Sequence, residues 1–411
     1  MGTQSRCNIM AEEPNIKCRI CGGTNFKEVI NFGESPLVNS LIEPEDIDKT
    51  EPTYPLIVHQ CQDCFLVQIV NPIDNHKIYQ EVDYLYFSSD MPGLFEYFRT
   101  YADYVHNLYL KPGDFVCEIG SNDGIWLKNF VRWTPVLGVE PATNVALRAI
   151  KNGIPTINQF FTERVAKQIE REYGKAKVIM GANCIAHLND LHDMMRGVKA
   201  LLKDDGVFSV ECNYWGGMVK NVNYALIYHD HFSYFTIGVW NTFLKEYGLK
   251  VFDAEVTPAQ GGSLRMYIGN YPVTERCQNL INEEELTKLN CYQTCEKYKN
   301  DCMSKANGLK AIVDKLKAEG KTIAGYGAAA KGFSLLQLAG ITKELDYFVD
   351  DSPAKQGKFT PVNHIPVISR EQANDRLPDY FFITAPNYAG IIMKKEKRSG
   401  VRFILEDGTI K

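Results

Sequence analysis

The sequence predicts an α/β protein with two doubly wound parallel sheets and a small metal-binding domain at the amino terminus. Two C-x-x-C pairs lie near the amino terminus, and two separate series of alternating strand and helix patterns follow. Each series has a glycine-rich loop after its first strand. A chain of 411 residues suits two or three domains. We expect domains over residues 1–78, 79–276 and 277–411.

The composition is that of an ordinary globular protein, with 45% hydrophobic and 23% charged residues. It excludes disordered and fibrous classes. The net charge of −5 disfavours a protein that wraps nucleic acid. No apolar run reaches the roughly 18 to 20 residues of a membrane helix, and the amino terminus lacks the apolar segment of a secretory signal. We therefore expect a cytoplasmic protein with no nucleic-acid or membrane partner.

The first expected element is a zinc site formed by the two C-x-x-C pairs, Cys18, Cys21, Cys61 and Cys64. Strand-like alternation around each pair predicts two β-knuckles, and two thiolates from each would complete a tetrahedron. A domain this small has a marginal core, so a structural Zn²⁺ would stabilise it. Four unrelated reduced thiols, or a dithiol redox pair, are the alternatives.

The second series predicts a parallel sheet covered by helices on both faces. Short apolar runs predict the strands, and amphipathic runs between them predict the helices. The expected strands are 115–119, 135–140, 176–182 and 206–213, and the expected helices are 124–133, 144–153 and about 190–203.

A glycine loop follows the first of these strands, with Glu118, Gly120, Asn122 and Gly124 in the run EIGSNDG. Its spacing differs from the G-x-G-x-x-G of dinucleotide-binding folds. The next strand ends in Glu140, where an acid can accept both hydrogen bonds of a ribose diol. The pattern predicts a nucleoside cofactor, and a purely structural turn is the alternative.

This combination resembles the class I S-adenosylmethionine methyltransferases. The resemblance implies that Gly120, Asn122 and Gly124 hold the methionyl part of the cofactor and that Glu140 holds its ribose. It also implies that Asn183, after the fourth strand, lines the same crevice.

A histidine-rich run, IYHDHFSYF, contains Tyr228, His229, Asp230 and His231. Histidine can act as a general base near neutral pH, and a carboxylate can orient it. If the run is extended, His229 and His231 share one face and Asp230 lies on the other. A structural role for these histidines is the alternative.

Two other segments carry candidate side chains. His187 follows a strand, where ligands bind in α/β sheets. The run DYLYFSSD adds Tyr84 and Tyr86, for which packing between domains is the alternative.

Residues 277–318 have a helical period and predict one or two long helices. Residues 319–411 then repeat the strand and helix alternation as a second, smaller Rossmann-like unit. The run from Gly325 through Gly327 to Ala330 fits G-x-G-x-x-A, and Asp350 ends the next strand. Taken alone, this is a dinucleotide fingerprint.

Further runs identify a more specific resemblance, to the sugar C-methyltransferases that act on nucleotide-linked keto-deoxysugars. The similarity covers nearly the whole chain. The runs are the paired C-x-x-C, YLYFSS, EIGSNDG, GVEP, IAH, IYHDHFSYFT, GGSLRMY, GYGAAAKG and DSPAKQGKFTPVNHIPV. The family has a zinc-binding domain, a methyltransferase core and a Rossmann-like carboxy-terminal domain. The chain departs from the family pattern at Asp230, where glutamate is common, and at Gln260, where histidine is common.

The resemblance implies S-adenosylmethionine-dependent methylation at carbon 3 of a dTDP-4-keto-6-deoxyhexose or a close relative. The ketone acidifies the adjacent C–H, and the resulting enolate attacks the methyl group. His231 would be the base. Other side chains would orient it or contact the keto sugar: Asp230, Tyr228, His187 and one of Tyr84 or Tyr86.

In this family context the second glycine loop would receive the nucleotide or diphosphate of the substrate. Gly327 would lie close to it at a helix amino terminus, and Lys331 would add a positive charge. An empty structural loop and a bound dinucleotide are the alternatives.

Other functions stay open at this point. They are O- or N-methylation of a sugar nucleotide, a zinc-ribbon methyltransferase acting on RNA or protein, and a catalytically silent scaffold that binds nucleotide sugars.

Overall fold

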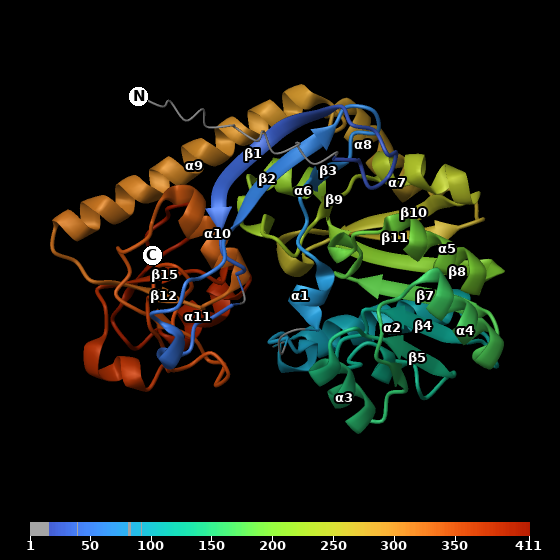
Figure 1. The fold of residues 1–411 in the computed structure, drawn as a ribbon, viewed down its shortest axis with the longest axis horizontal. Coiled ribbons are helices and arrows are strands. Elements are labelled where there is room, and N and C mark those ends of the chain that lie inside the picture. The colour runs from blue at the N-terminus through green and yellow to red at the C-terminus, as the bar shows by residue number, and fades with distance from the viewer. Residues whose placement is uncertain (1–15, 39, 81–83, 92) are drawn as a thin grey trace, which may run out of the picture.

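A computed structural model describes residues 16–38, 40–80, 84–91 and 93–411, whose strands form three sheets (Figure 1). The first sheet is antiparallel, in the order β1-β2-β3-β9. Its strands are β1 (Phe26–Ser35), β2 (Tyr54–Cys61), β3 (Val67–Ile69) and β9 (Ser233–Tyr234). The last of these comes from the middle of the chain, where Tyr234 pairs with Val67. The expected boundaries at residues 78 and 276 stay predictions.

The second sheet has seven strands in the order β10-β11-β8-β7-β4-β5-β6. Strands β6, β5, β4, β7 and β8 are parallel, and β11 enters antiparallel beside β8. The strands are β4 (Val116–Ile119), β5 (Val136–Val139), β6 (Thr156–Ile157), β7 (Ala176–Ala182), β8 (Leu202–Asn213), β10 (Lys250–Thr257) and β11 (Ser263–Gly269). This order confirms the predicted class I methyltransferase core.

Helices cover both faces of this sheet. Side chains of α4 (Glu163–Tyr173), α5 (Leu191–Leu201) and α7 (Ile237–Leu244) share one apolar core with it. On the opposite face, α2 (Leu94–Tyr109) and α3 (Thr143–Lys151) contribute to a second core. Parallel strands buried in this way need apolar side chains on both sides, so polar residues within them are informative.

The predicted helix over 124–133 is wrong, because this run forms turns and a short 3₁₀ helix at Leu127–Asn129. The Asn129 amide donates to the carbonyls of Ile125 (3.1 Å) and Trp126 (3.3 Å). A regular α-helix would use those carbonyls for backbone N–H groups. The apolar spacing that suggested a helix instead buries Trp126, Leu127 and Phe130 against α2.

The carboxy-terminal part contains α8 (Glu275–Leu286), α9 (Tyr292–Ala318) and a third, parallel sheet, and so confirms the second Rossmann-like unit. The sheet order is β14-β13-β12-β15-β16, with α10 and α11 between strands. The elements are β12 (Ile323–Tyr326), α10 (Ala330–Ala339), β13 (Phe348–Val349), β14 (Val367–Ile368), β15 (Tyr380–Ile383), α11 (Ala389–Lys395) and β16 (Arg402–Ile404).

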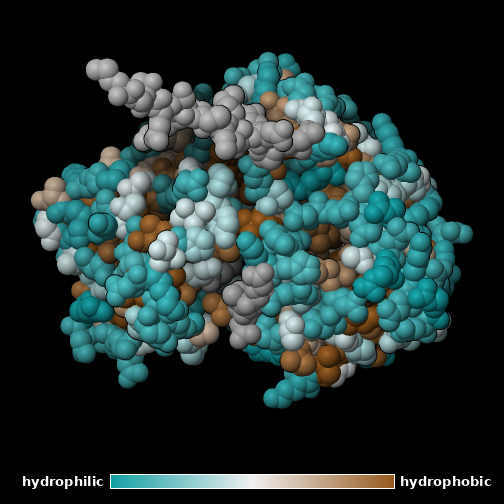
Figure 2. Space-filling view, viewed as in Figure 1, coloured by the Kyte–Doolittle hydropathy of each residue, from teal (hydrophilic) through white to brown (hydrophobic). Residues whose placement is uncertain are grey.

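The long helix α9 connects the two lobes that are visible in Figure 1. Its buried residues share one apolar core with strands β1 and β2 and with the third sheet. The amino-terminal sheet is therefore packed against the carboxy-terminal lobe through α9. Figure 2 shows that this side of the molecule is largely hydrophilic, with scattered apolar residues. Among the described helices, none has both the length and the apolar character that crossing a bilayer requires.

Candidate active site

The four predicted zinc ligands lie together. Their sulfur atoms are all within 4.8 Å of one another, with Cys18 Sγ 3.4 Å from Cys64 Sγ and Cys21 Sγ 3.6 Å from Cys61 Sγ. Zn–S bonds of about 2.3 Å in a tetrahedron put sulfurs roughly 3.8 Å apart, so the group fits one Zn²⁺. The residue after each second cysteine, Gly22 (φ 68°) and Phe65 (φ 66°), has a left-handed backbone. The two knuckles thus have matching turns and leave no ligand position open.

Arg19 lies inside the first knuckle and reaches beyond it. Its guanidinium donates to Gln68 Oε1 (3.0 Å), to the Ile69 carbonyl (2.6 Å) and to the Phe232 carbonyl (3.1 Å). Phe232 directly follows His231 in the chain. The zinc knuckle is therefore hydrogen-bonded to the segment that carries the predicted base.

The first glycine loop packs closely against side chains of the same core. Gly120 (φ 63°) and Gly124 (φ 80°) are left-handed, and an added Cβ would lie 2.6 Å from Cys184 and 2.7 Å from Ile154. Only glycine fits at these two positions. Glu118 Oε2 is buried without a hydrogen-bond partner, and burial raises the pKa of this carboxyl well above its usual value. An orphaned acceptor beside an open backbone turn fits a ligand that carries donors, such as the aminoacyl part of S-adenosylmethionine.

Glu140 stands at the end of the neighbouring strand, as predicted. Its two carboxylate oxygens accept from the backbone N–H groups of Asn122 and Ala142, both at 2.9 Å. Each oxygen keeps a second lone pair for a ribose hydroxyl. Burial raises the pKa of Glu140 to about 7.

Residues 84–89 cross over the glycine loop and are held to it by side-chain amides. Asn122 Oδ1 accepts from Ser88 N (2.8 Å) and its Nδ2 donates to the Tyr86 carbonyl (3.1 Å). Asn144 bonds both backbone groups of Tyr84, at 3.3 Å and 3.0 Å. Tyr84 and Tyr86 are thereby placed beside the cofactor loop.

The histidine-rich run forms a turn and is not extended. His231 N donates to the Tyr228 carbonyl (2.9 Å), so the chain reverses between them. His229 consequently points away, with its ring 6.0 Å from Tyr54, while His231 lies 4.0 Å from the Tyr228 ring and 5.1 Å from the His187 ring. The shared face that an extended run would give to His229 and His231 does not exist.

His231 is buried and its tautomer is fixed. Its Nδ1 lies 2.6 Å from the Leu226 carbonyl, which can only accept, so Nδ1 carries the proton and Nε2 has the lone pair. Burial lowers the pKa of His231 well below its usual value, with His187 and Lys331 lowering it further. The ring is therefore neutral at physiological pH.

His187 contacts a residue that the sequence reasoning missed. The Tyr79 hydroxyl lies 2.5 Å from His187 Nδ1. Burial raises the pKa of Tyr79 well above its usual value, so the phenol keeps its proton and can donate to Nδ1 or accept from it. Burial lowers the pKa of His187 to about 4, so this ring is neutral at physiological pH.

The other predicted catalytic residues surround this histidine pair. The Tyr84 ring lies 5.1 Å from Tyr79. Asp230 and Tyr86 are close enough to Tyr84 and Tyr228 for their charges to act on both phenols, whose pKa values burial already raises. These candidates therefore lie in one cluster.

Strand β8 contributes polar residues that the sequence reasoning also missed. Ser209, Glu211 and Asn213 alternate with apolar residues on one face of this buried strand. Ser209 Oγ lies 2.5 Å from the Tyr101 hydroxyl, and Asn213 Nδ2 lies 3.0 Å from His231 Nδ1. The sequence signal that could have identified them is the alternation of polar and apolar residues, S-V-E-C-N, in a strand that is buried on both faces.

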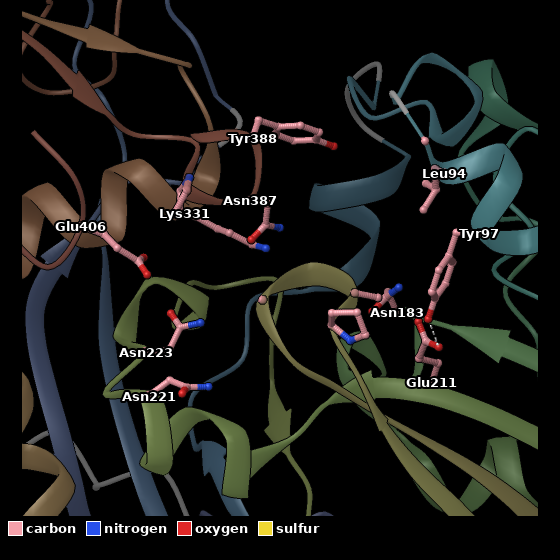
Figure 3. A pocket seen from close by; sticks show the side chains of 15 residues that line it. Leu94, Tyr97, Asn183, Glu211, Asn221, Asn223, Lys331, Asn387, Tyr388 and Glu406 are labelled. Atoms are coloured by element: carbon pink, nitrogen blue, oxygen red, sulfur yellow. Dashed lines mark hydrogen bonds between the residues drawn. The ribbon is translucent and has the colours of Figure 1, made fainter. Parts of the chain in front are cut away.

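A cavity of about 520 Å³ lies between the core and the carboxy-terminal lobe (Figure 3). Asn183 and Glu211 line it from the core, and Lys331, Asn387 and Glu406 line it from the other side. The predicted cofactor residue Asn183 and the predicted substrate residue Lys331 thus border the same space. Burial lowers the pKa of Lys331 to about 7.

The second glycine loop is largely satisfied by its own chain. Asp350 accepts from Ala328 N (2.8 Å) and Ser352 N (2.9 Å), and Lys355 Nζ lies 3.4 Å from it. Asp350 thus accepts from two backbone N–H groups, as Glu140 does, and differs from it by the Lys355 ammonium group beside Oδ2. Gly327 (φ 99°) approaches Ala385, whose Cβ would lie 2.7 Å from an added Cβ, and its contact with substrate stays a prediction.

Comparisons with known proteins cover every part of this arrangement. Residues 18–79 match the family described as "Putative zinc binding domain", and residues 95–254 match "Methyltransferase domain". Residues 258–406 match "C-methyltransferase C-terminal domain". The C-methyltransferase NovU of Streptomyces niveus is 34% identical over 402 residues, which are 95% of each chain.

Solved structures of other methyltransferases resemble a smaller part. Magnesium protoporphyrin IX methyltransferase of Synechocystis PCC 6803, with bound SAH, is 11% identical with a TM-score of 0.35, covering 43% of this chain and 83% of its own. A S-adenosylmethionine-dependent methyltransferase of Clostridium acetobutylicum is 11% identical with a TM-score of 0.34, covering 44% and 94%.

Proposed function

The chain belongs to the C-methyltransferase family and is a S-adenosylmethionine-dependent methyltransferase with a zinc-binding domain, and we propose that it methylates a nucleotide-linked 4-keto-6-deoxysugar. The carbon we assign is C-3, next to the ketone, and the nucleotide is dTDP. The observation that carries this proposal is the pair of buried, neutral histidines His187 and His231, whose rings lie 5.1 Å apart. We assign them opposite tautomers, so that one offers a lone pair and the other an N–H, which is what forming an enolate requires.

The cofactor would be held by the residues of the first glycine loop and the adjacent strand ends. Gly120, Asn122 and Gly124 would surround its methionyl part, and Glu140 would accept from its ribose. Glu118 and Asn183 would complete this side of the crevice. When bound, S-adenosylmethionine supplies an electrophilic methyl group.

His231 Nε2 takes the proton from the carbon next to the ketone. The electrons of that C–H bond move to the ketone oxygen, and the resulting enolate carbon forms the new C–C bond as the methyl leaves its sulfur. A neutral, buried imidazole whose Nδ1–H is held by the Leu226 carbonyl leaves Nε2 unprotonated, 3.4 Å from the Asn213 amide nitrogen, which the substrate would displace. Tyr228 borders this ring, and Asp230 acts on Tyr228; the two would orient the ring or the sugar.

The negative oxygen of the enolate needs donors. In the tautomer we assign to it, His187 supplies its Nε2–H, and Tyr79 donates to Nδ1. Tyr84 and Tyr86 lie beside this pair, and burial keeps the Tyr84 phenol protonated by raising its pKa. Donors fixed before the reaction stabilise the developing charge without reorganisation.

The nucleotide end of the substrate would lie toward the carboxy-terminal lobe. Lys331, in the first turn of α10, and the amides of Asn221, Asn223 and Asn387 border the cavity there. Glu406 also borders the cavity on this side, so Lys331 and the amides would have to outweigh one carboxylate in holding a diphosphate. The negative charge of the diphosphate would raise the pKa of Lys331 from about 7 and keep it charged.

The test is incubation of the pure protein with S-adenosylmethionine and a panel of dTDP-4-keto-6-deoxyhexoses. We expect a product heavier by one CH₂, with NMR placing the methyl on C-3. A methyl on C-5, the other carbon next to the ketone, would show that C-3 is the wrong assignment for the methylated carbon. A methyl on oxygen or nitrogen, or no product from any sugar despite cofactor binding, would refute the proposed reaction.

The base is tested separately by solvent deuterium exchange at C-3. We expect His231→Asn to abolish both exchange and turnover while S-adenosylmethionine still binds. His106→Gln is the matched control, because His106 stacks on Trp133 of the opposite core and lies outside the cluster. Normal exchange in a folded His231→Asn variant would show that another group removes the proton.

A further inference from the structure

Glu211 lines the cavity and has one carboxylate oxygen without a hydrogen-bond partner. Its Oε2 accepts from the Tyr97 hydroxyl (2.5 Å) and from Arg265 Nε (3.0 Å). Its Oε1 is buried and has no hydrogen-bond partner, and the side chain is 0% exposed. Figure 3 shows Glu211 beside Tyr97 and Asn183 at the cavity wall. A buried carboxylate oxygen without a donor is costly unless a ligand supplies one.

The surroundings hold this carboxylate firmly. Arg265 stands directly opposite Glu211 on β11 and also donates to the Tyr97 hydroxyl (2.7 Å). The guanidinium lies 3.4 Å from the centre of the Tyr101 ring and is shared with Glu255 (3.2 Å). Tyr97 and Arg265 therefore hold Oε2 from two sides, and this also fixes the position of Oε1. An acceptor fixed before binding is typical of a specific ligand site.

The position of Glu211 relative to the predicted base follows from the strand. Glu211 and Asn213 are alternate residues of β8, so their side chains lie on one face, about 7 Å apart along the strand. Asn213 contacts His231 at 3.0 Å. That spacing is comparable to the width of a pyranose ring. A sugar with its reacting carbon at His231 would extend toward Glu211.

We propose that Glu211 determines how the sugar is seated, by accepting through Oε1 a hydrogen bond from a hydroxyl or ammonium group on the ring. This inference rests on the proposed function. Tyr97 and Arg265 are positioning residues that act through the carboxylate. The contact fixes which of the two carbons beside the ketone faces His231, so Glu211 is a specificity-determining residue as well as a binding one.

The test compares Glu211→Gln with Glu255→Gln on four dTDP-4-keto-6-deoxy substrates. Both variants remove one carboxylate from Arg265, but Glu255 is one-third exposed and lies outside the cavity lining. The substrates differ in one ring donor each, with 2-hydroxy paired against 2-deoxy and 3-hydroxy against 3-deoxy. Measured quantities are KM for the sugar, Kd for S-adenosylmethionine and the ratio of C-3 to C-5 methylation.

We expect Glu211→Gln to raise the sugar KM about tenfold to a hundredfold, the loss of a hydrogen bond to a charged group. The Kd for the cofactor should stay within about twofold, and C-5 methylation should appear. The effect should vanish for the one substrate that lacks the relevant donor. Glu255→Gln should change KM by less than about twofold.

Three results would overturn the inference. An unchanged sugar KM in a folded Glu211→Gln variant would show that Glu211 does not contact the sugar. An equal loss of cofactor affinity would place the donor on S-adenosylmethionine instead. If the variant does not fold, a wild-type protein that has the same KM for all four substrates would refute the inference. A wild type that methylates none of them would instead refute the proposed function.

Discussion

Replacing Arg19 by methionine tests whether the zinc knuckle supports catalysis. The change keeps an unbranched but shorter apolar side chain and removes the donors to Gln68, Ile69 and Phe232. Zinc should stay bound, because the four cysteines are untouched. The turn that carries His231 would lose one of its contacts with the amino-terminal domain.

The size of the effect follows from these three bonds. A hydrogen bond to a charged group contributes about 1.5 to 3 kcal/mol, and the Phe232 carbonyl keeps a second donor, Ile69 N at 2.9 Å. We therefore expect a loss of roughly 2 to 4 kcal/mol in unfolding free energy, within a typical total of about 5 to 15 kcal/mol. Displacing a reacting group by about 1 Å can reduce turnover about a hundredfold, so kcat should fall by one to two orders of magnitude.

The assay measures zinc content, thermal unfolding, kcat and the Kd for S-adenosylmethionine. Cofactor affinity should persist, because Gly120 and Glu140 follow β4 and β5 and do not contact Arg19. Lys17→Met, which removes an exposed charge beside the same knuckle, is the control. An Arg19→Met protein with full zinc, a lowered melting temperature and normal kcat would refute the coupling.

Removing zinc with a chelator, or replacing Cys21 by serine, should lower the melting temperature and abolish turnover, because the small sheet loses its crosslink; metal analysis with calorimetry checks this, and an unchanged melting temperature in the metal-free protein would contradict it. The pKa of Glu140, about 7, means that its carboxyl ionises as pH rises through 7, so the Kd for S-adenosylmethionine should increase about tenfold between pH 8 and pH 6. Glu140→Gln should bind weakly with no such slope, and a wild-type Kd independent of pH would contradict the assigned contact. Asn122→Ala should weaken cofactor binding about tenfold and speed amide exchange over residues 84–89, since two hydrogen bonds that tether them are lost; unchanged exchange would contradict the tether.

Much of the fold could be predicted, because its signals are local. Apolar runs identified β4, β5, β7 and β8, and the paired C-x-x-C identified the zinc site. The resemblance to C-methyltransferases is confirmed by the identity with the Streptomyces niveus protein. The helix predicted over 124–133 was wrong because apolar spacing could not show that the Asn129 side-chain amide would bond the carbonyls that a helix needs. Strand β9 escaped prediction because two residues have no periodicity, and their partner β3 is remote in sequence.

The site was predicted where residue type and motif agreed, and missed where only tertiary contacts reveal a role. His187 and His231 were expected from their runs, but the contacts of their Nδ1 atoms with Tyr79 and with the Leu226 carbonyl were not. The sequence shows Glu211 only as an acid within a strand. The structure adds that Tyr97 and Arg265 both bind one of its carboxylate oxygens and leave the other without a partner.

The pairing of β3 with β9 also bears on how the protein is made. Arg19 and the Phe232 carbonyl that it binds are 213 residues apart, so at 5 to 20 residues per second the ribosome needs roughly 10 to 40 s to supply the partner. The cysteines and the first three strands emerge long before that. Zinc can therefore close the knuckles early, while the edge of β3 waits unpaired for Ser233 and Tyr234. The metal holds strands β1 to β3 in register until β9 has been synthesised and completes the sheet. An amino-terminal fragment that ends before β9 would leave the edge of β3 unpaired and prone to aggregation.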